Sequence, residues 1–115
     1  MANIFDLPPE LPTEECFEPL VSGDNVLIER IISTGQITPV GEWYNQERDE
    51  WVILLQGDAT LGYFDGSRIQ LKAGDYVFIP ARQKHRVEYT SSKPPCIWLA
   101  VHGRLHPKLL AGTWA

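Results

Sequence analysis

Residues 50–71 read EWVILLQGDATLGYFDGSRIQL, and this stretch decides the fold. Apolar, β-branched and aromatic residues form three short runs in it, each shorter than an ordinary helix. Asp65-Gly66 separates the last two runs, and because both residue types readily adopt positive φ, the pair predicts a tight β-hairpin. The stretch therefore predicts three consecutive β-strands.

The same pattern of short runs between turn residues continues on both sides of this stretch. No window of about ten residues or more has a helical apolar period, so no amphipathic helix is predicted. Strands are predicted at residues 26–34, 50–56, 59–64, 67–71, 76–79, 85–90 and 97–102. Short strands at this spacing predict an all-β fold, a β-barrel or sandwich of the jelly-roll type.

The chain has 115 residues, of which 43% are hydrophobic, and this length leaves room for one hydrophobic core. Residues 1–23 contain four prolines and five acidic residues, which exclude a long helix there. We expect an extended N-terminal arm at residues 1–24, packed along the domain or onto a second copy. The barrel is predicted at residues 25–103 and a C-terminal tail at 104–115.

The charge balance bears on the partners of the protein. Ten Lys and Arg residues stand against 15 Asp and Glu residues, a net charge of −5. Nucleic-acid binding is not expected, because it needs a cationic face. The longest apolar runs have five residues, at 51–55 and 97–101, so no membrane span is expected.

The start of the chain and the cysteines predict a cytoplasmic protein. Residues before Arg30 contain no Lys or Arg and no long apolar run, so no secretory leader is expected. Cys16 and Cys96 are then expected to be reduced thiols. Cys96 opens an apolar run, which favours a buried structural cysteine over a catalytic one.

Strand alternation places a carboxylate and an imidazole inside the predicted barrel. If Val52 faces the core, Glu50 does so too, and an extended approach to this strand adds Tyr44 and Gln46. In the strand at residues 85–90, His85 and Tyr89 point inward together. A buried acid and histidine are costly unless paired or bound to a ligand, so either an ion pair or a functional site is expected.

The orientation of His102 depends on which face of the strand at residues 97–102 is buried. If Ile97, Leu99 and Val101 face the core, His102 points outward with Trp98. We favour this arrangement because three aliphatic side chains suit a dry core. In the opposite arrangement His102 joins the site.

These residues resemble the two motifs of the cupin superfamily. In the first motif, six residues separate a glutamate from a glycine, as they separate Glu50 from Gly57. The second motif has the spacing of Gly74, Pro80 and His85. The resemblance covers residues 25–103 and implies a small cupin-like barrel with a polar site at its centre.

The resemblance also implies a divalent metal site, in which the motifs of this chain depart from the usual ligands. Tyr44 and Gln46 stand where cupins usually have two histidines, so the implied metal set is Gln46, Glu50 and His85, and the ion would be weakly held or absent. The implied function is a metal-dependent enzyme, dioxygenase- or isomerase-like, acting on a small polar organic molecule. The identity of the metal and the reaction stay open.

Two further interpretations remain open. One is a metal-free module that binds or senses a small ligand, with Tyr44, Arg48, Tyr89 and His102 as further pocket residues beside the motif side chains. The other is a homodimer formed through edge strands and the N-terminal arm, without a small-molecule site. A homodimer is expected in either case.

Overall fold

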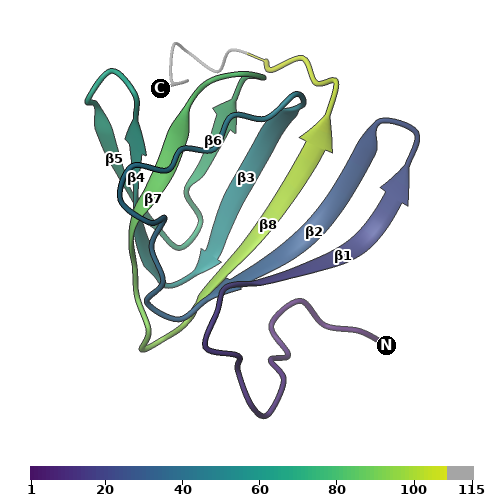
Figure 1. Cartoon of the computed structure of the whole chain (residues 1–115). Helices are drawn as coiled ribbons and strands as arrows, with labels where there is room; N and C mark the ends of the chain where they lie inside the picture. The colour runs from purple at the N-terminus through teal and green to yellow at the C-terminus, as the bar shows by residue number, and fades with distance from the viewer. Residues whose placement is uncertain (109–115) are drawn as a thin grey trace.

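A computed structural model describes residues 1–108, and its regular structure is entirely β (Figure 1). The ends of all seven predicted strands lie within one residue of those observed, and one strand was missed. The strands are β1 (Cys16–Gly23), β2 (Val26–Ser33), β3 (Asp49–Gln56), β4 (Asp58–Tyr63), β5 (Arg68–Lys72), β6 (Tyr76–Ile79), β7 (His85–Thr90) and β8 (Cys96–Gly103). No helix among these residues is long and apolar enough to cross a membrane.

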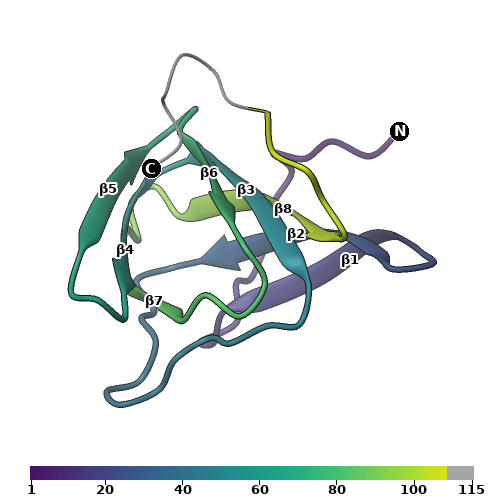
Figure 2. The ribbon, with the colours of Figure 1, turned by 90° about the horizontal axis from the view of Figure 1, so that it is seen from above.

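The strands form two antiparallel sheets that face each other (Figure 2). The larger sheet has the order β1-β2-β8-β3-β6, and the smaller one has the order β5-β4-β7. Strands far apart in sequence are neighbours in both sheets, which is the connectivity of a jelly-roll barrel. The predicted fold class is confirmed.

The predicted hairpin joins β4 to β5. Gly66 has φ of 92° and its N–H donates to the carbonyl of Tyr63, while the Asp65 carboxylate accepts a hydrogen bond from the Ser67 N–H at 2.8 Å. Positive φ costs little for glycine and the Asp side chain replaces a backbone acceptor. Asp65-Gly66 thus forms the predicted turn, and the positive φ of Gly66 is the property on which the prediction rested.

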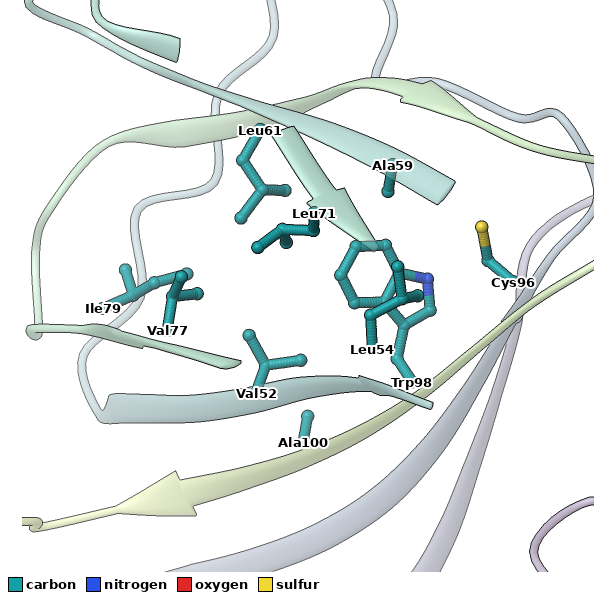
Figure 3. Packing of buried hydrophobic residues seen from close by; sticks show 10 residues of the cluster. All are labelled: Val52, Leu54, Ala59, Leu61, Leu71, Val77, Ile79, Cys96, Trp98 and Ala100. Atoms are coloured by element: carbon teal, nitrogen blue, oxygen red, sulfur yellow. The ribbon is translucent and has the colours of Figure 1, made fainter. Parts of the chain in front are cut away.

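The hydrophobic core fills the space between the sheets towards one end of the barrel (Figure 3). Leu54 and Trp98 lie near its centre, and the indole N–H of Trp98 donates to Ser33 Oγ at 3.2 Å. The buried cluster consists of Val52, Leu54, Ala59, Leu61, Leu71, Val77, Ile79, Cys96, Trp98 and Ala100. Cys96 is fully buried, as predicted, and is a free thiol.

The last third of the predicted extended arm is strand β1, at the edge of the larger sheet. Pro19 lies on this edge strand beside an irregular register, where its missing N–H is tolerated. The segment before β1 lies against the domain: the Arg30 guanidinium donates to the carbonyls of Ile4 and Asp6. Of the predicted tail at residues 104–115, residues 109–115 lie outside the described part of the chain.

Candidate functional site

A cavity with mixed polar and apolar walls lies between the sheets, near the start of β3 and the end of β8. Both of these strand ends are at the top of Figure 1. The cavity volume of about 60 Å³ is room for a few waters or an organic molecule of a few non-hydrogen atoms. The polar lining consists of Glu15, Glu29, Tyr44, Gln46, Glu50, His85 and His102, and the apolar lining of Phe17, Ile31, Val52, Leu61, Ile79, Val87 and Trp98.

Glu50 is the buried acid of the cavity. Its place in β3, two residues before Val52, turns it inward as predicted, and only 7% of it is exposed. Across residues 1–108 the carboxylate accepts no hydrogen bond. Burial raises the pKa of Glu50 from 4.5 to about 7, with His102 lowering it and Glu29 raising it further. At neutral pH the protonated and ionised forms of this group therefore coexist.

His85 is the buried imidazole opposite Glu50. Its Nδ1 lies 2.9 Å from the carbonyl oxygen of Gln83, which only accepts, so Nδ1 carries the hydrogen. Burial lowers the pKa of His85. The neutral ring therefore presents a bare Nε2, which lies 3.9 Å from Oε1 of Glu50, too far for a direct hydrogen bond.

Tyr44 and Gln46, the predicted neighbours of this pair, both line the cavity. The backbones of Tyr44 and His85 exchange hydrogen bonds of 2.8 and 3.2 Å, which brings their rings into a stack with centroids 5.4 Å apart. The Gln46 carbonyl accepts from the N–H of Arg82 at 2.7 Å. These backbone bonds hold the approach to β3 extended, so its alternate side chains face the cavity.

The favoured orientation of His102 was wrong. Trp98, Ala100 and His102 face the interior, and Glu50 pairs directly with His102 in the β3–β8 register. The aliphatic pattern misled because β8 is the central strand of its sheet: Ile97 on the outer face is also fully buried. The hydrogen bond from Trp98 to Ser33 satisfies the indole N–H, so this side chain can be buried without leaving a donor unpaired.

Two acids of the cavity were missed in the sequence. Glu29 in β2 lies 2.9 Å from Nε2 of His102, and both side chains are buried. Glu29 shares a strand face with Ile31, so alternation could have placed it inside. Glu15 precedes β1 and accepts a hydrogen bond from Ser33, and burial raises its pKa. No sequence pattern predicted its position, because β1 itself was missed.

Two predicted pocket residues lie outside the cavity. Tyr89 is 51% exposed, because the β4–β7 register shifts between Thr60 and Leu61, where Glu88 is the extra residue that reverses the alternation after Val87. Arg48 is exposed and lines a neighbouring depression, which shares Glu29, Gln46 and His102 with the cavity. Tyr89 does not line the cavity, whereas Arg48 lies in the depression next to it.

The donor set does not fit a resident metal ion. Glu50 and His85 are two strong donors and Gln46 offers a weaker amide oxygen, whereas metal sites in enzymes ordinarily have three strong protein ligands. Among residues 1–108, no group of three or more His, Cys, Asp or Glu side chains is placed so that it could hold a metal. Nε2 of His102, the other buried imidazole of the cavity, is already engaged by Glu29.

Solved structures with the same fold include proteins with different names. A candidate mannose-6-phosphate isomerase from Ralstonia eutropha JMP134 is 37% identical, with 91% of this chain and 98% of that chain covered and a TM-score of 0.85. A cupin superfamily protein from Desulfitobacterium hafniense is 20% identical, with 90% and 100% covered and a TM-score of 0.68. The polyketide cyclase RemF from Streptomyces resistomycificus is 21% identical, with 87% and 75% covered and a TM-score of 0.66.

The family of the chain follows from sequence and fold together. No curated protein is similar enough in sequence to match the chain. Residues 32–102, which hold both motifs and the buried Glu50 and His85, match the Cupin domain family. The two facing antiparallel sheets agree with that match. The chain belongs to the cupin domain family.

Proposed function

We propose that the protein is a proton-transfer enzyme of the isomerase type, which acts on a small polar organic molecule without a metal ion. The observation that carries the proposal is the buried Glu50 carboxyl, which accepts no hydrogen bond from residues 1–108 and lies 3.9 Å from the bare Nε2 of His85. Burial raises the pKa of Glu50 to about 7 and lowers the pKa of His85, so that a proton donor and a neutral proton acceptor face one cavity, as general acid–base catalysis needs.

The gap between the two groups supports a ligand between them. At 3.9 Å neither atom satisfies the other, so both can contact a substrate. In the reaction, Nε2 of His85 takes a proton from the hydroxyl-bearing carbon next to a carbonyl while protonated Glu50 gives its proton to the carbonyl oxygen. The enediol then returns one proton to Glu50 and receives the other from His85 at the neighbouring carbon, so the substrate is isomerised and both residues are restored.

The charge of the lining supports a substrate that is not anionic. Three glutamates line the cavity, and none of the described lining residues is Lys or Arg. The name of the Ralstonia relative suggests a sugar phosphate, but a phosphate inside this cavity would meet carboxylates and no cation. The volume of about 60 Å³ also favours a much smaller molecule than a hexose phosphate.

Hydrogen exchange at carbon tests the proposal. The purified protein in D₂O with a chelator is expected to exchange the α-hydrogens of small hydroxy- and aminocarbonyl compounds, such as glycolaldehyde, dihydroxyacetone and aminoacetone, measured by ¹H NMR. Glu50→Gln and His85→Gln are expected to lower the rate about 10²-fold or more, the usual contribution of a general acid or base. Tyr89→Phe, outside the cavity, serves as the control and should keep the rate.

Absence of exchange above the protein-free rate with every compound would contradict the catalytic proposal. Exchange that survives Glu50→Gln would contradict the role of Glu50. Exchange that appears only after a divalent metal is added would favour the second candidate, a metal-dependent enzyme with the ion at Gln46, Glu50 and His85. The specific observation in favour of that candidate is that both Oε1 and Nε2 lack a direct hydrogen bond to each other and can take a third partner.

We also propose that the protein is a cytoplasmic homodimer. Support for association comes from β1, an edge strand that exposes Phe17, Leu20 and Val21. An edge strand with unpaired backbone groups and apolar side chains favours pairing with a second chain. The free thiols of Cys16 and Cys96 are consistent with a reducing compartment.

A further inference from the structure

The cavity collects carboxylates from three separate parts of the chain. Glu15 enters from the segment before β1, Glu29 from β2 and Glu50 from β3. No Lys or Arg is found among the described lining residues. Side chains from unrelated positions thus give the cavity one sign of charge, which favours a positively charged ligand and disfavours an anion.

Acidic residues alone do not make a binding site, and Glu50 provides a second and independent observation. The side chain is more than nine-tenths buried, faces the cavity and accepts no hydrogen bond from residues 1–108. The described residues give the carboxylate no hydrogen-bond donor while its oxygens stay accessible from the cavity, so a polar group bound there can supply one.

The other two carboxylates, Glu29 and Glu15, differ in the side chains that already bind them. Glu29 is already paired with the buried side chain of His102, whose Nε2 lies 2.9 Å from its Oε1. Glu15 accepts a hydrogen bond through Oε2 from the neutral hydroxyl of Ser33, which leaves its charge uncompensated. Since Glu50 is assigned to the proton transfer, Glu15 is the carboxylate available to hold a cationic group.

Aromatic side chains stand beside these carboxylates. Phe17, two residues after Glu15 and on the same face of the extended chain, lines the cavity, and so do Tyr44 and Trp98. Trp98 is tied to Glu15 through Ser33, which accepts from the indole N–H and donates to the carboxylate. Aromatic faces next to a carboxylate are the usual surroundings of a bound ammonium group.

We propose that the cavity binds a small organic ammonium compound, with Glu15 as the counter-charge and Phe17 and Trp98 as aromatic walls. This inference rests on the proposed function, since it names the substrate class of the same site: a protonated amine that also carries a hydroxyl or carbonyl group. The amine faces Glu15, and the oxygen-bearing end faces Glu50 and His85. Glu15 is a specificity-determining residue in this arrangement.

Calorimetric titration with three probes of nearly equal size tests the inference: protonated ethanolamine, neutral ethylene glycol and anionic glycolate, in about 0.15 M salt to screen distant charges. Ethanolamine is expected to bind at least about tenfold more tightly than ethylene glycol, and glycolate not at all. Glu15→Gln is expected to remove that preference. Glu14→Gln makes the same change of charge on an exposed neighbour outside the cavity and is expected to keep it.

Equal binding of ethanolamine and ethylene glycol would overturn the inference, and so would equal loss of affinity in Glu14→Gln and Glu15→Gln, which would indicate unspecific attraction to an acidic protein. The outcome is separate from that of the proposed function. Exchange of glycolaldehyde hydrogens without ethanolamine binding would leave the acid–base site standing and remove the ammonium site. Ethanolamine binding lost in Glu15→Gln, without any hydrogen exchange, would do the reverse.

Discussion

Replacing Glu50 by glutamine is expected to make the protein about 3 kcal/mol more stable, relative to wild type, at pH 8.5 than at pH 4. The pKa of Glu50 is about 7 in the folded protein and 4.5 in the unfolded chain, and each pKa unit corresponds to about 1.4 kcal/mol. Below pH 4.5 the group is protonated in both states and costs nothing. Between pH 4.5 and 7 only the unfolded chain releases the proton, so the wild type loses stability as pH rises.

Denaturant unfolding of both proteins at several pH values measures this difference. A constant offset from the glutamine amide does not matter, because the prediction concerns the change with pH. Glu14→Gln, which removes an exposed carboxylate, is the matched control and should follow the wild-type curve closely. Parallel curves for wild type and Glu50→Gln would show that Glu50 ionises normally in the folded protein and would contradict the description of the site.

Replacing Gly57 by alanine is expected to cost about 3 kcal/mol or more. Gly57 has φ of 96°, and a Cβ there would lie 2.8 Å from Ser91 Oγ and 3.0 Å from the Cα of Cys96. The left-handed conformation costs about 1–2 kcal/mol for alanine, and a contact with backbone that cannot move aside adds about 1–3 kcal/mol. The glycine of the first motif is therefore needed because the turn between β3 and β4 passes close to Ser91 and Cys96.

Gly74→Ala separates the two contributions. Gly74 has the same φ of 96°, but a Cβ there would have no neighbouring atom within 4 Å, so only the conformational cost of about 1–2 kcal/mol is expected. Thermal and denaturant unfolding of both variants compare them directly. Equal destabilisation by the two substitutions would show that the close approach at Gly57 is absent.

The strands could be predicted from the sequence because their causes are local. Short apolar runs and turns such as Asp65-Gly66 fix the strand positions within residues 26–102, and the structure agrees within one residue at each end. Strand β1 was missed because residues 1–23 indicated only an extended arm, whereas an edge strand tolerates Pro19 at an irregular position. β1 is held by its pairing with β2, and local sequence patterns do not reveal which strands pair.

The site could be predicted only where alternation is unbroken. Glu50 lies next to a clean apolar alternation in β3 and was placed correctly inside the barrel, as was His85. Tyr89 was misplaced because a single extra residue in β7 reverses the alternation. His102 was misplaced because both faces of β8 are covered, so hydrophobicity does not tell inside from outside. The Glu29–His102 pair follows from strand order, which the sequence pattern did not supply.

The ionisation of Glu50 in the metal-free protein tests the central claim most directly. Selective ¹³C labelling of glutamate, with the Glu50 signal assigned by its loss in Glu50→Gln, allows the side-chain carboxyl carbon to be followed by NMR as pH is raised. We predict a midpoint near the folded pKa of about 7. A midpoint near the ordinary value of 4.5 would show that the carboxyl is solvated or paired, and it would contradict an acid–base site built on Glu50 and His85.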